Sequence, residues 1–187
     1  MESLFDHVLD DDEKLIKVFK PNRTKFFFSN IFGMALFMLM FLLIGILAVV
    51  FPEEGVEVNL WYLFIPIGLY LIILTLSIVF TVIYYNNVFY AYTDRRIVIR
   101  SGIFGVDYKS LDMSMIGAVD VYVSLFDKIL RKNTGSLCYG SMASPMVNTH
   151  GGGSAYRFNH IVAPYETCKE IKNAINEYKK SLDEKKK

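Results

Sequence analysis

Two long apolar stretches dominate the hydrophobic pattern of this chain. Residues 31–51 (IFGMALFMLMFLLIGILAVVF) and residues 60–85 (LWYLFIPIGLYLIILTLSIVFTVIYY) contain no Asp, Glu, Lys, Arg or His. A helix needs about 20 predominantly apolar residues to cross the roughly 30 Å hydrocarbon core of a bilayer. Because only residues 52–59 separate the two stretches, they predict an antiparallel hairpin of two transmembrane helices within residues 26–85.

The distribution of charge predicts how this hairpin is oriented. Every Lys and Arg lies in residues 1–25 or 95–187, whereas the loop 52–59 carries three Glu. Lys and Arg are retained on the cytoplasmic side of a membrane. We therefore expect a multi-pass protein of the cell (plasma) membrane, with both termini in the cytoplasm and the loop outside. Transport pathways usually contain intramembrane ionisable residues, so spans that lack them indicate an anchor.

From Val88 onwards the hydrophobic period changes to two. Val119, Val121 and Val123 alternate with Asp120 and Tyr122, as in a half-buried strand. Alternation, β-branched and aromatic residues together predict strands at 88–93, 96–101, within 103–113, and at 118–124, 135–142 and 154–162.

The end of the chain has helical periodicity. Pro164 suits the first position of a helix. Apolar or aromatic residues then recur at three- and four-residue steps: Tyr165, Cys168, Ile171, Ile175, Tyr178 and Leu182. This stripe should pack on the sheet. The predicted fold class is α+β with a membrane anchor: a transmembrane hairpin, then a bent antiparallel sheet or small β-barrel closed by a C-terminal helix. The predicted boundaries are a cytoplasmic segment at 1–25, a cytoplasmic domain at 86–180 and a charged tail at 181–187.

Composition excludes several classes of function. The net charge of +1 gives no reason to expect a nucleic acid partner. The two cysteines, Cys138 and Cys168, fit no metal-binding spacing. The segment HGGGS (150–154) lacks the Gly-Lys-Ser/Thr ending of a phosphate-binding loop. No acid–base or nucleophile constellation is visible, so we expect no enzyme activity, no cofactor and no metal.

Three segments resemble a known family. They are YAYTDRRIVIRSGIFG (90–105), YKSLDMSMIGAVDV (108–121) and LFDKIL (125–130). They are similar to the prokaryotic, bacterial-type PH-like domain of small membrane proteins with two transmembrane helices. The likeness covers roughly residues 14–178 and is strongest over 90–123. The resemblance implies a PH-like β-barrel at the inner membrane face, without enzymatic activity.

Basic residues of the domain are candidates for contact with anionic lipid. They are Arg95, Arg96, Arg100 and Lys109. Five or six extended residues place the turn at Asp94 up to roughly 20 Å from the second span, beyond the roughly 8 Å Debye length. Arg100 and the following turn return towards the span and are better placed. Ile103 and Phe104 in that turn are either core contacts, which we prefer, or an apolar tip at the membrane surface. Structural or solvated arginines are the alternative to lipid binding.

The sequence as a whole favours a non-enzymatic, membrane-anchored interaction module. Its PH-like domain would present a cytoplasmic surface to a protein partner, to a second copy of the chain or to anionic lipid. The alternative is a small oligomeric channel or a transporter accessory subunit. A conducting hairpin would need several copies that line a pore with polar groups.

Overall fold

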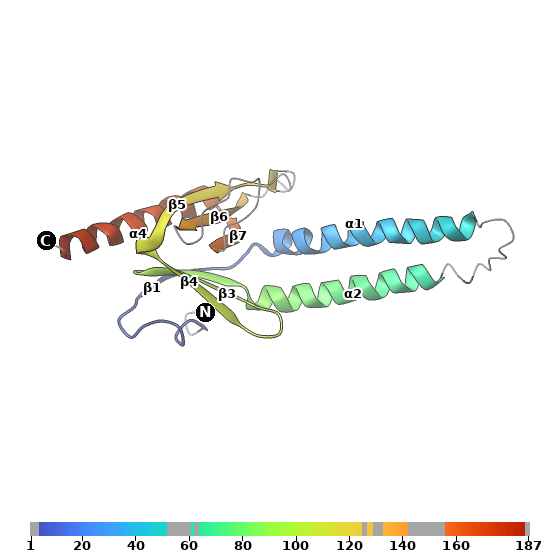
Figure 1. Ribbon diagram of the computed structural model, residues 1–187, viewed down its shortest axis with the longest axis horizontal. Coiled ribbons are helices and arrows are strands. Elements are labelled where there is room, and N and C mark those ends of the chain that lie inside the picture. The colour runs from blue at the N-terminus through green and yellow to red at the C-terminus, as the bar shows by residue number, and fades with distance from the viewer. Residues whose placement is uncertain are drawn as a thin grey trace. The chain divides into compact units, whose positions relative to one another are not determined.

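The structure of the 187-residue chain is a computed structural model (Figure 1). It describes residues 4–51, 61, 64–124, 127–128, 133–141 and 156–185. The predicted loops at 52–59 and 150–154 lie outside the described residues. The chain divides into two compact units: Phe26–Asn86, here called the hairpin, and Met1–Lys25 with Asn87–Lys187, here called the domain. The hairpin is thus inserted into the sequence of the domain.

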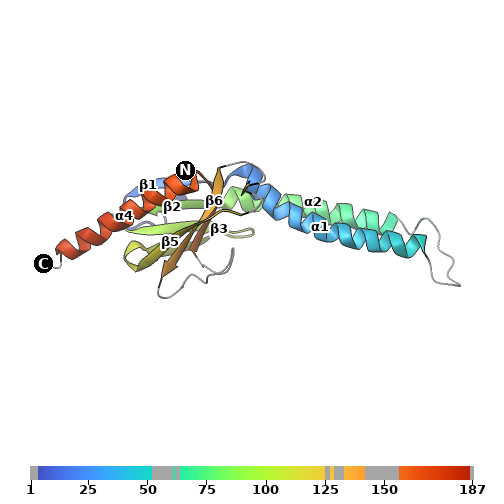
Figure 2. The ribbon, with the colours of Figure 1, turned by 90° about the horizontal axis from the view of Figure 1, so that it is seen from above.

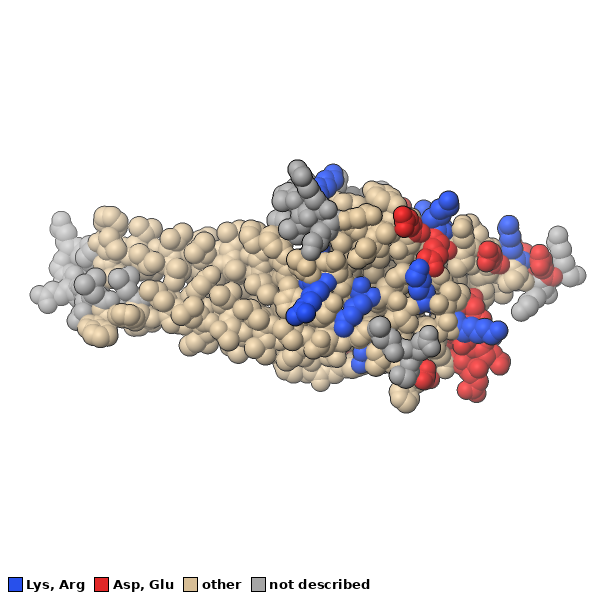
Figure 3. All heavy atoms as spheres, turned by 180° about the vertical axis from the view of Figure 1, so that it is seen from behind, with Lys and Arg blue, Asp and Glu red and all other residues tan. Residues whose placement is uncertain are grey.

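The hairpin consists of helices α1 (Arg23–Val50) and α2 (Phe64–Asn87). Both are long and apolar enough to cross a membrane, as the two apolar stretches predict. Their side chains are exposed around the helices, for example Leu47 at 55% and Ile72 at 59%. A helix that is apolar all round requires an apolar environment. Figure 3 shows the hairpin as a surface without charged side chains on the face in view.

Helix α1 begins earlier than the predicted span. The side-chain oxygen of Asn22 accepts a hydrogen bond from the backbone N–H of Lys25 at 3.1 Å, which is an N-cap. At the same end of the hairpin, Phe26 packs against Tyr84 and Tyr85, with ring centroids 5.4 and 5.3 Å apart. These aromatic contacts hold the two helices together.

Polar groups in the hairpin bond to their own helices. Asn30 donates to the carbonyl of Phe26, and the hydroxyl of Thr81 donates to Ser77, both four residues back. They therefore need no partner across a pore. Pro66 lies in the first turn of α2 as described, where its missing N–H needs no acceptor.

The domain contains two antiparallel sheets and a C-terminal helix, as predicted. Sheet A has the order β1-β2-β3-β4 and sheet B the order β5-β6-β7. A single 3-10 turn, η3 (Met113–Met115), connects the sheets. The elements are β1 (Leu15–Phe19), β2 (Phe89–Thr93), β3 (Arg96–Ser101), β4 (Asp107–Asp112), β5 (Ile116–Tyr122), β6 (Thr134–Ser141), β7 (Tyr156–Val162) and α4 (Pro164–Lys185).

Strand β1 precedes the hairpin and is not predicted by the sequence pattern. It pairs with β2, which follows the hairpin, and Phe19 lies opposite Tyr90. A register shift between Leu15 and Lys17 interrupts the pairing. Because of this irregularity, the apolar residues of so short a strand do not alternate with polar ones, and the sequence pattern does not predict it. Residues before and after the hairpin therefore belong to one sheet.

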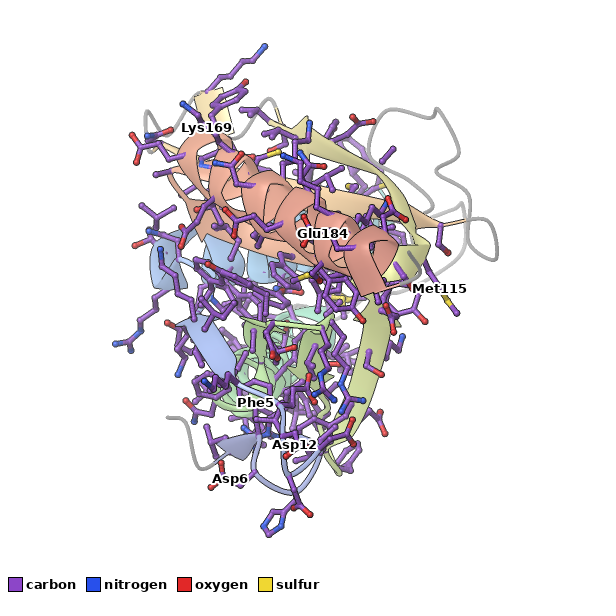
Figure 4. All side chains as sticks on the ribbon, turned by 90° about the vertical axis from the view of Figure 1, so that its left-hand side faces the viewer. Phe5, Asp6, Asp12, Met115, Lys169 and Glu184 are labelled. Atoms are coloured by element: carbon purple, nitrogen blue, oxygen red, sulfur yellow. The ribbon has the colours of Figure 1, made fainter. Side chains whose placement is uncertain are left out.

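The middle of sheet A is covered on both faces, which explains why every residue of β2 is buried. On one face, Phe5 is fully buried and packs with Phe89, Ala91 and Val98. On the other face, Tyr90 stacks on Phe158 of sheet B at 4.8 Å. Figure 4 shows Phe5 on the opposite side of the domain from α4. The N-terminal segment is therefore the cover of one face of sheet A.

Helix α4 packs along β5 and β6 (Figures 1 and 2). The predicted stripe is confirmed for Cys168, Ile171 and Ile175, which are buried, whereas Tyr165 is 66% exposed. The helix continues to Lys185, through residues that the sequence assigns to a charged tail. Leu, Lys and Glu favour helix and no Gly or Pro interrupts it.

Candidate membrane-contact site

Strand β3 has a turn rich in basic or apolar residues at each end. Residues 94–95, here called the distal turn, join β2 to β3, and residues 102–106, here called the exit turn, join β3 to β4. The first pair of β2 and β3 is Phe89 opposite Arg100. Because β2 starts immediately after α2, the exit turn lies at the end of sheet A where the chain returns from the hairpin.

The exit turn exposes three apolar side chains. Phe104 is 91% exposed, Ile103 40% and Val106 41%. Of the two alternatives for Ile103 and Phe104, the preferred one, a core contact, is therefore wrong. The reason is that β3 and β4 pair only up to Ser101 and Asp107, so the five residues between them extend past the sheet.

Glycine shapes this turn. Gly102 has a φ of +150°, and a Cβ there would collide with the carbonyl oxygen of Gly105. Only glycine fits such a backbone without strain. The carbonyl of Gly102 accepts a hydrogen bond from the side-chain amide of Asn87 at 3.1 Å. Asn87 is the last residue of α2, so the turn is fixed to the point where the chain re-enters the domain.

Two cations lie beside the exit turn. The guanidinium of Arg100 is 5.5 Å from the ring centroid of Phe89, and the Nζ of Lys20 is 4.6 Å from it. Cation–π contacts of this kind contribute about 0.5–1 kcal/mol at exposed sites. They hold positive charge at the end of β3 from which the exit turn starts.

The basic residues near the distal turn have a different environment. The Nε of Arg96 donates to Glu13 at 2.9 Å, and its Nη2 donates to the carbonyl of Val8 at 3.1 Å. The side chain of Glu13 is completely buried. Burial alone would raise the pKa of Glu13, but hydrogen bonds from Arg96 and Thr93 outweigh it, so the pKa falls below its ordinary value. Arg96 therefore binds the N-terminal segment.

The predicted site residues thus separate into three places. Arg100, Ile103 and Phe104 come together at the exit turn. Arg95 and Arg96 lie at the opposite end of β3. Lys109 is exposed within β4, opposite Ile99. Sequence reasoning missed Lys20 and Val106, although Val106 follows the same pattern of apolar residues beside a turn glycine.

A second buried ion pair also joins the two parts of the domain sequence. The Nζ of Lys25 lies 3.1 Å from Asp127, and the two side chains are 2% and 4% exposed. Asp127 also accepts from the hydroxyls of Ser124 and Thr134. Burial pushes the pKa of Asp127 up, but these hydrogen bonds and Lys25 lower it overall. The ammonium of Lys25 also donates to the hydroxyl of Ser124 at 3.1 Å, so this ion pair is part of a hydrogen-bonded network.

No group of three or more His, Cys, Asp or Glu side chains within the described ranges could hold a metal ion. Cys138 in β6 and Cys168 in α4 are free thiols. Burial raises the pKa of both thiols, so they remain protonated and poorly nucleophilic at neutral pH.

The two-sheet domain with its C-terminal helix is a PH-like α+β fold, and two long apolar helices accompany it. The family model of the Bacterial PH domain matches residues 30–137. The chain therefore belongs to the bacterial PH domain family. No curated protein and no solved structure matches the chain. The matched region contains Arg96 and Asp127, whereas their partners Glu13 and Lys25 precede it.

Proposed function

We propose that this protein is a non-enzymatic, membrane-anchored interaction module that contacts an anionic bilayer surface through its exit turn. The observation that carries this proposal is the exposure of Phe104, at 91%. Its turn follows β3 at the end where the cations of Arg100 and Lys20 lie over the ring of Phe89. An apolar tip flanked by cations matches a membrane surface, where acyl chains lie beneath negatively charged headgroups.

Chain connectivity supports the location of this contact. The predicted second span ends at Tyr85, and Asn87 follows it by two residues. The side chain of Asn87 holds the carbonyl of Gly102. The exit turn is thus bonded to a residue that lies within about 7 Å of chain length from the span. The distal turn lies at the far end of β3 and lacks such a link.

The expected strength of the contact is modest. A basic residue near an anionic surface contributes about 1 kcal/mol, and fully burying a Phe side chain contributes about 1.5–3 kcal/mol. A few kcal/mol would not hold a soluble protein on a membrane firmly. A free energy of this size is sufficient to orient a domain that two spans already hold at the bilayer. The spans keep the turn at a high effective concentration near the lipid, so the contact behaves as an intramolecular one.

The proposed topology places both termini in the cytoplasm. Positive residues flank the hairpin on one side, and the pairing of β1 with β2 requires residues 15–19 and 89–93 to be on the same side of the membrane. In a variant without Cys138 and Cys168, Val56→Cys should react with an impermeant thiol reagent on intact cells, and Ser181→Cys should not. The reverse pattern would contradict the orientation.

Lipid contact is tested with a soluble form of the domain. Residues 4–25 are joined to residues 87–187 by a flexible linker, which keeps β1 and both buried ion pairs. This protein should bind liposomes that contain anionic lipid, and binding should decrease with salt. Arg100→Glu should abolish binding, whereas Arg95→Glu serves as the matched control and should have a smaller effect. Absence of binding at low salt would refute the lipid contact.

A further inference from the structure

Strand β5 is the outer strand of sheet B as far as the chain is described, because sheet B has the order β5-β6-β7. The outer edge of such a strand presents backbone N–H and C=O groups that can pair with another extended chain. The side chain of Lys179 in α4 donates to one carbonyl of this strand, that of Ile116, at 2.7 Å. Lys179 therefore already occupies the carbonyl of Ile116, and the segment that follows it is the part of the strand left for a ligand.

A cleft of about 280 Å³ lies between this strand and α4. Val119 and Ile175, both 5% exposed, form its apolar part. Gly117 and Ala118 are exposed and have little or no side chain, so a ligand can approach the backbone of β5 closely. A register shift between Ile116 and Ala118 further separates this segment from regular pairing with β6.

The charged groups of the cleft favour an acidic ligand. Lys172 and Lys179 line it from α4, and Asp120 is the single carboxylate among the lining residues. Asn176, between the two lysines, supplies an amide. Next to the start of β5, Met115 is 62% exposed, and Figure 4 shows it at the edge of the domain, near the C-terminal half of α4. Met is a flexible apolar contact for a binding partner.

We infer that this cleft binds an extended, acidic peptide segment of a protein partner, which adds a strand to the edge of β5. Main-chain hydrogen bonds to β5 would supply affinity, and the lysines of α4 would select acidic side chains. A second copy of this chain would bring its own α4 to the same edge. A single extended segment therefore fits the cleft better than another sheet. This inference names a partner class for the interaction module and does not depend on the lipid contact.

The probe is a library of random dodecapeptides displayed on phage, selected against the full chain in nanodiscs. We expect the selected peptides to carry a net negative charge and β-branched residues. Their affinity, measured by fluorescence anisotropy, should fall at least tenfold in the double variant Lys172→Glu/Lys179→Glu. The matched control Lys169→Glu/Lys180→Glu makes the same charge change on α4 outside the cleft and should bind normally.

Two further readouts separate strand addition from other binding modes. The bound peptide should slow amide hydrogen exchange in residues 116–120, and peptides with Lys in place of Glu should regain affinity for the Lys172→Glu/Lys179→Glu variant. The inference is overturned if no peptide is selected, if the double variant binds as the control does, or if exchange in β5 is unchanged. Arg100→Glu, which tests the lipid contact, should leave peptide affinity unaltered.

Discussion

Arg96 and Arg100 lie on the same face of one strand and have opposite roles in the structure. Arg96 is bonded to Glu13, which precedes the hairpin, and to the carbonyl of Val8. Arg100 lies over the ring of Phe89 beside an exposed apolar turn. Both arginines belong to the segment that resembles the family, and four residues separate them. The role of a basic residue in this domain therefore depends on which segment, distant in the sequence, packs against it.

The two arginines are expected to contribute differently to the stability of the domain and to its contact with a membrane surface. Removing one partner of a buried ion pair leaves an uncompensated charge and typically costs about 3–5 kcal/mol. A cation over an aromatic ring contributes about 0.5–1 kcal/mol at exposed sites and about 2 kcal/mol when desolvated, and Arg100 is half-buried. The distal end of β3 should therefore respond to mutation through folding, and the exit end through contact with its surroundings.

The largest expected effect comes from removing the N-terminal segment. A fragment of residues 86–187 lacks β1, the cover provided by Phe5, and the partners of Arg96 and Asp127. We expect it to show no cooperative thermal unfolding by circular dichroism. The linked form of residues 4–25 and 87–187 should unfold cooperatively. Equal melting curves for the two proteins would show that residues 4–25 are dispensable.

A smaller effect is expected from changing each arginine in the linked form. Arg96→Ala leaves the buried carboxylate of Glu13 without its main partner and should lower the free energy of unfolding by about 2–4 kcal/mol. Arg100→Ala should lower it by about 1–2 kcal/mol, because Arg100 is half-buried over the ring of Phe89. Chemical denaturation provides both values. A larger loss for Arg100→Ala would reverse the comparison.

The sequence predicts the local elements of this structure but not the contacts between distant segments. The spans, the six strands that follow them and the buried stripe of α4 are predictable because their patterns are local. Glu13 and Arg96 are 83 residues apart, so no local pattern connects them, and the irregular pairing of β1 hides that strand. Phe104 is predicted as core because apolar residues usually are, although the glycines at 102 and 105 indicate a tight turn outside the sheet.

Acid should weaken the distal end of β3 more than its exit end. The pKa of Glu13 is lowered in the folded domain from an ordinary value near 4.5. A lowered pKa stabilises the fold above that ordinary value, and the contribution is lost as pH falls below about 4.5 and through the folded pKa. Glu13→Gln should therefore reduce the loss of melting temperature between pH 5 and pH 3. Arg100→Gln should leave that loss unchanged, and an equal effect of both variants would contradict the assignment.

The smallest effect on stability is expected at the exit turn itself. Phe104 is 91% exposed, so Phe104→Ser should change the melting temperature of the linked form by less than about 2 °C, since exposed positions generally alter stability by under about 0.5 kcal/mol. The same variant should reduce binding to anionic liposomes. Gly102→Ala is the contrasting change, because it strains the backbone of the turn, and it should lower the melting temperature.

The most direct test measures how deeply the two turns lie relative to the bilayer. A spin label is attached at Phe104→Cys or at Asp94→Cys in the full chain without Cys138 and Cys168, reconstituted in nanodiscs with anionic lipid. Relaxation by oxygen, which concentrates in the bilayer, is compared with relaxation by a water-soluble nickel chelate. We expect the label at 104 to relax more with oxygen and the label at 94 to relax more with the nickel chelate. Equal, nickel-dominated responses at both positions would contradict it.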